Sequence, residues 1–336
     1  MGYAPKYTIT SHLAGLLEKI AELRTKIELS PISVQWIPRL ERDAFARLAH
    51  TSTAIEGNPL TLRDVEILSQ GGDLPMVQRR FKNEVLNYLA ALRYITDHSA
   101  KRTLTVKDVL RLHSIVGKDA LERDPVGAFR DYQVVIRQHR PPKHQDVPRL
   151  VTELVDWLNS EARDLPAVIS SAILHYQVEN IHPFGDGNGR VGRLLSTWEL
   201  YRRKIDTYHI FSIDEVYWEK REKYFTEIRS VQETGGDLTG WIEFVADAVA
   251  VALEQAWKRI EVIRRENATG GEALILTPKQ ERLLTLLRHA PLGINDIMKE
   301  LRVTTRAGAH HIIKPLIEHK LVVRRGSHKT GKYMLV

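Results

Sequence analysis

One short run of the sequence, His182–Arg193, collects residue types that could bind and attack a phosphate. It reads HPFGDGNGRVGR and contains glycines at Gly185, Gly187 and Gly189. Glycine lets the backbone turn sharply and approach a ligand closely, and a helical pattern follows the last of these glycines. The N–H groups of Gly187, Asn188 and Gly189 would then form an anion nest at the positive end of a helix dipole.

Charged side chains in the same run complete this chemistry. Arg190 and Arg193 lie three residues apart and share one face of the first helical turn. Paired guanidinium groups beside an anion nest suit a polyphosphate, and Asp186 offers hard oxygen ligation for Mg²⁺. His182 exchanges a proton near neutral pH without a large change in its pKa. The run therefore predicts a magnesium–nucleotide site with a base beside a phosphate.

Composition removes several other chemistries. The 336 residues include no cysteine, which excludes disulfide scaffolds, thiolate metal sites and a cysteine nucleophile. Neither an HExxH zinc motif nor a GxxxxGK[ST] phosphate loop occurs. The hydrophobic content of 43% is typical of a folded protein. Because no secretory signal and no membrane-spanning stretch is visible, we expect a cytoplasmic protein.

The positive charge of the chain lies at one end. Residues 271–336 hold 12 of the 49 Lys and Arg residues and 5 of the 42 Asp and Glu residues, so the formal excess of +7 lies there. A polar run with paired glycines, 266–272, precedes this segment and is typical of a linker. We predict an N-terminal helical region, a catalytic core, a linker and a basic domain, over 1–78, 79–265, 266–274 and 275–336.

Apolar residues at helical spacing predict a mainly helical chain. The expected helices cover 11–27, 39–53, 77–96, 105–116, 147–161, 167–179, 189–203, 213–232 and 238–267, with another capped by Thr61 and Asp64. The β-branched and aromatic run Tyr132–Ile136 predicts a short hairpin among these helices. The candidate phosphate site therefore lies between two helices.

The run His182–Arg193 matches every fixed position of the HPFx[DE]GNGRxxR signature, and the chain therefore resembles the Fic family. His175–Ile181 resembles the helix that leads into the signature, and Gly127–Ile136 resembles the family's flap segment. The resemblance covers roughly residues 80–250. It implies a helical bundle with a β-hairpin flap, in which most characterised members transfer AMP from ATP to a hydroxyl side chain of a target protein.

The resemblance also implies a role for each residue of the run. His182 would take the proton from the target hydroxyl, and Asp186 would bind Mg²⁺ between the α- and β-phosphates. The target segment would pair with the flap through its main chain. Nucleotide contacts would come from Gly185, Gly187, Asn188, Gly189, Arg190 and Arg193, and the flap from Tyr132, Gln133, Val134, Val135 and Ile136.

Upstream, the run Ser52-Thr-Ala-Ile-Glu56-Gly57 resembles the inhibitory motif [ST]xxxE[GN] of many Fic proteins. There the glutamate pairs with the second arginine of the signature, here Arg193. A carboxylate at that position would take the place of the γ-phosphate and repel it. In some members the same glutamate instead orients a water molecule, and the enzyme removes AMP from its target. The sequence leaves both roles open.

The basic C-terminal segment predicts three helices and two strands. Thr277 and Pro278 begin the first helix, 293–301 forms the second, and the third runs from Thr304 or Thr305 toward Lys320, with a kink or an early end at Pro315. Residues 321–335 form the strands, and the whole resembles a winged helix-turn-helix. Such modules bind DNA or dock proteins. DNA contacts would come from Thr305, Arg306 and His310 in the major groove, and from Arg324, Arg325, Lys329 and Lys332 on phosphates.

Three functions follow as hypotheses. The first is a protein adenylyltransferase restrained by Glu56, using ATP and Mg²⁺ to modify a Ser, Thr or Tyr hydroxyl of a target protein or of itself. The second is a deAMPylase or dual enzyme in which Glu56 activates water. The third is a DNA-binding regulator with a nucleotide-sensing Fic core. CMP or UMP transfer is also compatible, since no identified residue reads the base, and a homodimer is a further candidate.

Overall fold

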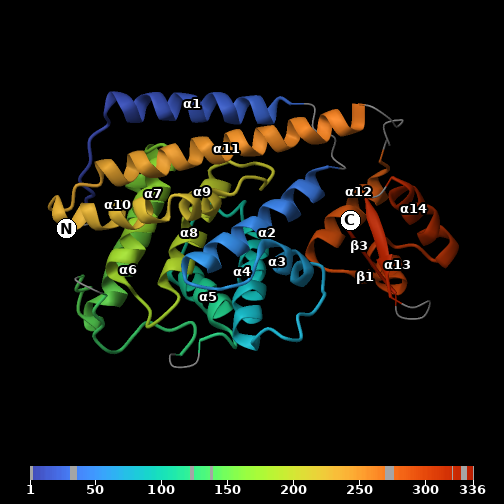
Figure 1. Cartoon of the computed structure of the whole chain (residues 1–336), viewed down its shortest axis with the longest axis horizontal. Coiled ribbons are helices and arrows are strands. Elements are labelled where there is room, and N and C mark those ends of the chain that lie inside the picture. The colour runs from blue at the N-terminus through green and yellow to red at the C-terminus, as the bar shows by residue number, and fades with distance from the viewer. Residues whose placement is uncertain are drawn as a thin grey trace. The chain divides into compact units, whose positions relative to one another are not determined.

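The computed structural model describes residues 3–30, 36–121, 125–136, 139–268, 276–319, 321–326 and 331–335 (Figure 1). Most of these residues are helical, and the one extended sheet among them has three short strands. The predicted fold class, mainly α with a small mixed C-terminal domain, is confirmed. No helix in the described segments is long and apolar enough to cross a membrane.

The chain divides into two compact units. The first unit comprises Met1–Glu28 and Phe45–Gln255, and the second comprises Leu29–Ala44 and Ala256–Val336. Two long helices, α2 (Ile37–Ile55) and α11 (Thr239–Ala268), contribute residues to both. Residues 269–275, which include most of the predicted linker, lie outside the described residues.

The helices of the first unit follow the predicted pattern closely. Besides parts of α2 and α11 they are α1 (Ser11–Glu28), α3 (Leu62–Ser69), α4 (Arg79–Asp97), α5 (Val106–Gly117), α6 (Val147–Asn159), α7 (Ala167–Ile181), α8 (Asn188–Arg202), α9 (Ile213–Glu219) and α10 (Arg221–Glu233). Short 3₁₀ turns occupy His144–Asp146 and Glu161–Asp164. Thr61 and Asp64 form a capping box at the start of α3, as predicted.

One predicted helix is wrong in its extent. The segment 213–232 forms two helices, α9 and α10, which are separated at Lys220 with φ −106° and ψ 35°. The Lys220 ammonium donates to Asp247 of α11 at 2.8 Å. Hydrophobic periodicity continues across this break, so the sequence pattern alone did not reveal it.

The helices α7 and α8 form the buried centre of the first unit, and the predicted site lies in the turn between them (Figure 1). Nearly every residue of both helices is buried, which is why their sequences lack a polar face. The hydroxyl groups of Ser171 and Ser196 lie 2.7 Å apart across the pair, and the Trp241 indole donates to the Ala172 carbonyl at 2.8 Å. The turn thus connects two well-held helix ends.

The predicted hairpin at Tyr132–Ile136 is reduced to one antiparallel bridge, between Ile136 and His139. Their N–H groups donate to each other's carbonyls at 2.9 and 2.8 Å, and residues 137–138 lie outside the described residues. Side chains donate hydrogen bonds to nearby carbonyls instead. Arg130 donates to the Tyr132 carbonyl, and Gln133 donates to the Pro141 carbonyl. The flap residues Tyr132 and Val135 are exposed.

The second unit holds the predicted helices and strands of the basic segment, together with a further short strand. Its elements are α12 (Pro278–His289), β1 (Leu292–Gly293), α13 (Ile294–Glu300), α14 (Arg306–Glu318), β2 (Val322–Arg325) and β3 (Lys332–Leu335). The sheet is antiparallel, in the order β1-β3-β2, with Val322 opposite Leu335. Pro315 lies inside α14, which continues to Glu318, so of the two expected outcomes, a kink or an early end, the early end does not occur. Lys329 lies outside the described residues.

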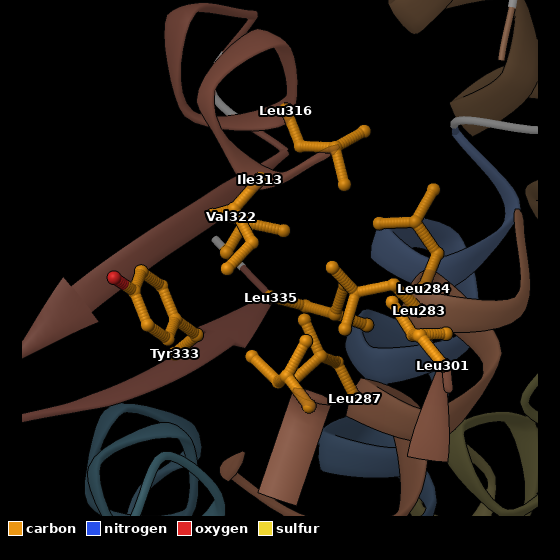
Figure 2. Packing of buried hydrophobic residues seen from close by; sticks show 10 residues of the cluster. Leu283, Leu284, Leu287, Leu301, Ile313, Leu316, Val322, Tyr333 and Leu335 are labelled. Carbon is orange, nitrogen blue, oxygen red and sulfur yellow. The ribbon is translucent and has the colours of Figure 1, made fainter. Parts of the chain in front are cut away.

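A compact apolar cluster holds this second unit together (Figure 2). Leucines of α12 face Ile313 and Leu316 of α14, and Val322, Tyr333 and Leu335 close the cluster from the sheet. Thr277 and Gln280 form a capping box that fixes the start of α12. Three helices are therefore packed on a small sheet by one core.

We expect Ile313→Ala to destabilise the second unit by about 2–5 kcal/mol, because this fully buried side chain would leave a cavity. Chemical denaturation, with amide hydrogen exchange of α12 and α14, measures the loss. Ile317 lies on the same helix and is exposed, so Ile317→Ala is the matched control and should change stability by about 0.5 kcal/mol or less. Equal losses for the two variants would contradict the assigned core.

Candidate active site

The turn between α7 and α8 is held in an uncommon backbone conformation. His182 adopts left-handed dihedrals, φ 50° and ψ 62°, and Gly187 has φ 82°. The His182 N–H continues the helix by donating to the Val178 carbonyl at 2.9 Å. The left-handed region is sparsely populated by residues other than glycine, so neighbouring groups must hold His182 in place.

Asn188 closes the turn with its side chain. Its Oδ1 accepts from the Phe184 N–H at 2.9 Å, and its Nδ2 donates to the Phe184 carbonyl at 2.8 Å. Sequence reasoning assigned Asn188 only a backbone role in the anion nest. The amide side chain also satisfies both main-chain groups of Phe184, which is fully buried. Asn188 therefore shapes the loop and begins α8.

His113 is a supporting residue that sequence reasoning missed. Its ring stacks on Phe184, with centroids 3.8 Å apart and planes at 12°. Its Nδ1 accepts from the Gly127 N–H at 2.9 Å, so Nε2 carries the proton and donates to the Asp186 carbonyl at 3.1 Å. The signal in the sequence was a histidine on the apolar face of α5, next to Leu112. This histidine connects the segment before the flap to the loop.

His182 has the environment of a neutral base. Its Nδ1 lies 3.4 Å from the Glu179 carbonyl and 3.9 Å from the Glu179 carboxylate. Burial lowers the pKa of His182 to about 4, and the charges of Arg130 and His139 act in the same direction. The Glu179 carbonyl and the Glu56 carboxylate oppose this shift. With Nδ1 donating to the carbonyl, Nε2 is left as the proton acceptor.

Asp186 is the one residue of the loop run with a half-exposed carboxylate; 52% of its side chain is accessible. Its Oδ1 accepts from the Gly187 N–H and lies 3.3 Å from Nη2 of Arg190. Across the described segments no cluster of three or more His, Cys, Asp or Glu residues could hold a metal ion. A lone carboxylate fits Mg²⁺ that is shared with phosphates and water better than a resident metal.

Arg190 is buried beside the carboxylate of Glu84 at 4.0 Å. Glu84 is itself fixed, because it accepts from Asn58 at 2.9 Å and from Arg80 at 3.1 Å. Within the described residues, Nε and Nη1 of Arg190 are buried without a hydrogen-bond partner. The guanidinium is thus held mainly by charge, and Nη2 points to Asp186.

Arg193 lies at the centre of the site and is almost completely buried. Its Nη2 donates to Glu56 Oε1 at 2.7 Å and to the Ser52 carbonyl at 3.0 Å, and its Nε donates to Ser52 Oγ at 2.7 Å. Nη1 approaches the Tyr224 hydroxyl at 3.4 Å. The contact that the resemblance implied between Glu56 and Arg193 is therefore present.

The end of α2 carries Glu56 onto the first turn of α8. The helix ends at Ile55, whose carbonyl accepts from Arg221 at 3.0 Å, and Gly57 follows with φ 95°. A Cβ atom added at Gly189 would collide with Glu56 Oε1. The glycine at position 189 therefore makes room for a carboxylate against the helix N-terminus, where an anion is stabilised.

A second carboxyl group, Glu179, was also missed by sequence reasoning. Burial, together with the negative charge of Glu56, raises its pKa to about 7, while the positive charge of Arg193 opposes the shift. Two acidic side chains therefore face one buried guanidinium. The sequence placed Glu179 on the helix leading to the loop but gave no sign of this coupling.

Comparisons with known proteins agree with this arrangement. Residues 103–200 match the model of the Fic/DOC family. Protein adenylyltransferase Fic of Drosophila willistoni is 31% identical over 251 residues, which are 70% of this chain and 48% of the relative. The Drosophila melanogaster protein of the same name is 32% identical over 275 residues, 77% of this chain and 53% of that protein. The chain thus spans about half the length of the curated relatives it matches.

Solved structures give the same result for the fold. A Fic family protein from Desulfovibrio desulfuricans G20 superposes with a TM-score of 0.65 at 26% identity, covering 99% of this chain and 98% of the other. Residues 134–508 of Caenorhabditis elegans Fic-1 superpose with a TM-score of 0.65 at 25% identity, covering 74% and 73%. Residues 103–200 thus form a Fic/DOC family domain, as the signature predicted.

We expect Glu179→Gln to change how stability depends on pH. The folded-state pKa of Glu179, about 7, lies above its ordinary value of 4.5, so the folded protein retains a proton that the unfolded chain loses. The retained proton contributes to the free energy of unfolding. This contribution is complete below pH 4.5 and is lost as the pH rises to 7, with a slope of up to about 1.4 kcal/mol per pH unit. Urea denaturation of both proteins across this range measures the difference.

The exposed Glu219 offers a matched control, because Glu219→Gln reports the generic effect of the same substitution. His182 and His175, whose pKa values burial lowers to about 4 and about 3, give the opposite slope. The part from His175 cancels in the difference, because Glu179 is not among the groups that act on it. A wild-type minus Glu179→Gln difference that stays flat between pH 4.5 and 7 would contradict the assignment.

Proposed function

We propose that this protein is a protein adenylyltransferase that transfers AMP from ATP to a Ser, Thr or Tyr hydroxyl of a target protein or of itself. The observation that carries the proposal is that one short turn joins His182, a largely covered imidazole whose pKa burial lowers to about 4, to the N-terminal start of α8. The curated relatives carry the name protein adenylyltransferase. The same geometry suits CMP or UMP transfer, because none of these contacts selects a base.

In this mechanism His182 Nε2 accepts the proton of the attacking hydroxyl, while Nδ1 stays on the Glu179 carbonyl. The N–H groups at the start of α8 and the guanidinium of Arg190 stabilise the negative charge of the phosphates. Asp186 would hold Mg²⁺, which supplies charge neutralisation at the phosphates. Pyrophosphate leaves as the hydroxyl oxygen attacks the α-phosphorus in line.

We further propose that Glu56 restrains this reaction. Its carboxylate forms an ion pair with the guanidinium of Arg193 at 2.7 Å. A terminal phosphate that bound to the same guanidinium would have to displace the carboxylate. An outer phosphate that entered beside Glu56 would meet like-charge repulsion. The Glu56 side chain is 39% accessible, so it can leave Arg193 without breaking a closed core.

We expect Glu56→Gly to raise AMP incorporation at least about tenfold, because removing the carboxylate frees Arg193 for phosphate. Intact mass spectrometry after incubation with Mg²⁺ and ATP detects each added AMP. The same variant carrying His182→Ala should bind ATP and incorporate none. Incorporation by Glu56→Gly equal to or below that of wild type would contradict the restraint.

A charge-only control separates loss of the carboxylate from added backbone freedom. Glu56→Gln keeps the shape of the side chain and should also activate, whereas Glu66→Gln, at an exposed position of α3, should not. Loss of AMP from premodified protein in wild type but not in Glu56→Gln would show that Glu56 serves hydrolysis. CTP or UTP in place of ATP tests the choice of base.

We propose a second function for the C-terminal unit as a winged helix-turn-helix that binds duplex DNA. The supporting observation is a basic face of α14, where Arg306, His310 and Lys314 are exposed at four-residue spacing. The β2–β3 strands lie beside it, because the Tyr333 hydroxyl approaches His310 at 3.5 Å and Arg324 lies over the Tyr333 ring. Helix and strands would then contact one duplex.

Replacing Arg306 and Lys314 together by alanine should weaken binding to a short duplex and reduce the slope of log affinity against log salt by about 2, since two phosphate contacts are lost. Fluorescence anisotropy at several salt concentrations measures both quantities. The matched control replaces Arg102 and Lys107, two exposed basic residues of the first unit. Absence of binding at low salt, or an equal loss in the control, would overturn the DNA proposal.

A further inference from the structure

Arg130 lies outside every helix yet is buried against the active-site turn. Its backbone N–H donates to the Pro183 carbonyl at 2.9 Å. Its side-chain Nε donates to the His182 carbonyl at 2.8 Å, and Nη2 lies 3.4 Å from the Ile181 carbonyl. One residue therefore binds three consecutive carbonyls of the turn that carries the proposed base.

The other side of the same guanidinium binds the flap segment. Nη1 donates to the Tyr132 carbonyl at 2.9 Å, and Nη2 donates to the Pro142 carbonyl at 2.6 Å. These two carbonyls lie at opposite ends of the segment that contains the Ile136–His139 bridge. An arginine presents five N–H donors in a fixed planar fork, so the two flap ends and the turn are held at set angles to one another.

The contact to His182 matters because of that residue's backbone. His182 is left-handed, with φ 50°, a conformation that persists only where surrounding groups enforce it. Its N–H is held by α7 and its carbonyl by Arg130. Without the guanidinium the carbonyl loses its buried donor, and the peptide can rotate toward a more populated conformation. The imidazole would then leave its position beside the start of α8.

We propose that Arg130 is a positioning residue that fixes the left-handed backbone of His182 and couples it to the flap. The inference deepens the proposed function and rests on it for its kinetic part. Arg130 touches no reacting atom; it acts through the main chain of His182 and of the flap ends. Arg130 would thereby fix the position of a target segment bound along the flap relative to the base that deprotonates it.

The positive charge of Arg130 gives the proposed role a measurable effect on the pKa of His182, which a merely structural contact would not have. The groups that act on His182 are Glu179 at the end of α7, Glu56 directly after α2, and Arg130 and His139 from the flap segment. The positive charge of Arg130 is one cause that lowers the pKa of His182. Arg130→Gln removes that charge and should raise the pKa, whereas Arg130→Lys keeps the charge but loses the planar fork.

Arg203 provides a matched control. It also binds three main-chain carbonyls with its guanidinium, those of Ala162, Arg163 and Leu165, at 3.3, 3.0 and 2.9 Å. These contacts lie at the end of α8 and touch neither the turn nor the flap. Arg203→Gln therefore removes a comparable set of bonds without changing the surroundings of His182.

The experiment uses the full chain with Glu56→Gly as background, and compares Arg130→Lys, Arg130→Gln and Arg203→Gln. We expect both Arg130 variants to lower the AMP incorporation rate at saturating ATP by about 100-fold, as misplacement of a reacting group does. ATP affinity, measured by titration calorimetry, should stay within about twofold. Arg203→Gln should change neither quantity. Rates for both Arg130 variants that match the Arg203 control, or a parallel loss of ATP affinity, would overturn the proposal.

A nuclear magnetic resonance titration of the His182 ring separates this inference from the proposed function. The His182 resonance should shift in both Arg130 variants, and its pKa should rise in Arg130→Gln but not in Arg130→Lys or Arg203→Gln. An unshifted resonance with an unchanged pKa in a folded Arg130→Gln protein overturns the inference. Absence of AMP incorporation in the Glu56→Gly background, with the expected resonance changes, would instead refute the adenylyltransferase proposal. If the Arg130→Gln protein does not fold, the Arg130→Lys protein decides the test. A rate of AMP incorporation equal to that of the Arg203 control, with an unshifted His182 resonance, would then overturn the inference.

Discussion

The buried guanidinium of Arg193 is the constraint on which the first unit depends. A charge removed from water is tolerated only when hydrogen bonds and an opposite charge surround it. Ser52 of α2, Glu56 directly after α2 and Tyr224 of α10 provide these partners. The guanidinium consequently fixes two helices against α8. An anion that displaces Glu56 must supply a similar charge at a similar place, and a phosphate oxygen meets that requirement.

Main-chain carbonyls in this site are held by side chains from distant segments. Arg130 and His113 each bind the turn at one end and the segment before or within the flap at the other. A turn of glycines would otherwise sample many conformations. Preorganised groups contribute most to catalysis when they need not move as the reaction proceeds. Among the described flap residues the Ile136–His139 bridge is the one strand-like pair, and the carbonyls of Tyr132 and Pro142 instead accept from Arg130.

Much of this architecture could be predicted from residue patterns. Helical periodicity located nearly every helix of the first unit, and the run from His182 to Arg193 predicted the candidate site and the family that residues 103–200 match. The patterns did not reveal the break at Lys220, because apolar residues keep their helical spacing across it. They also did not reveal β1, because a strand of two residues is too short to show alternating polar and apolar positions. Arg130, His113 and Glu179 were missed for another reason. Their roles depend on contacts between residues far apart in the chain, which local spacing does not encode.

The two carboxyl groups near Arg193 make the base and the phosphate site electrostatically dependent on each other. While Glu56 sits on the guanidinium, its charge raises the pKa of Glu179, and a neutral Glu179 offers little stabilisation to a protonated His182. The charge of Glu56 also acts on His182 directly, where it opposes the effect of burial and raises the pKa of the imidazole. Glu56 on Arg193 therefore influences both titratable groups beside the turn. A phosphate oxygen that replaced Glu56 on Arg193 would bring negative charge to the same place, and it would act on the pKa values of Glu179 and His182 in the same directions.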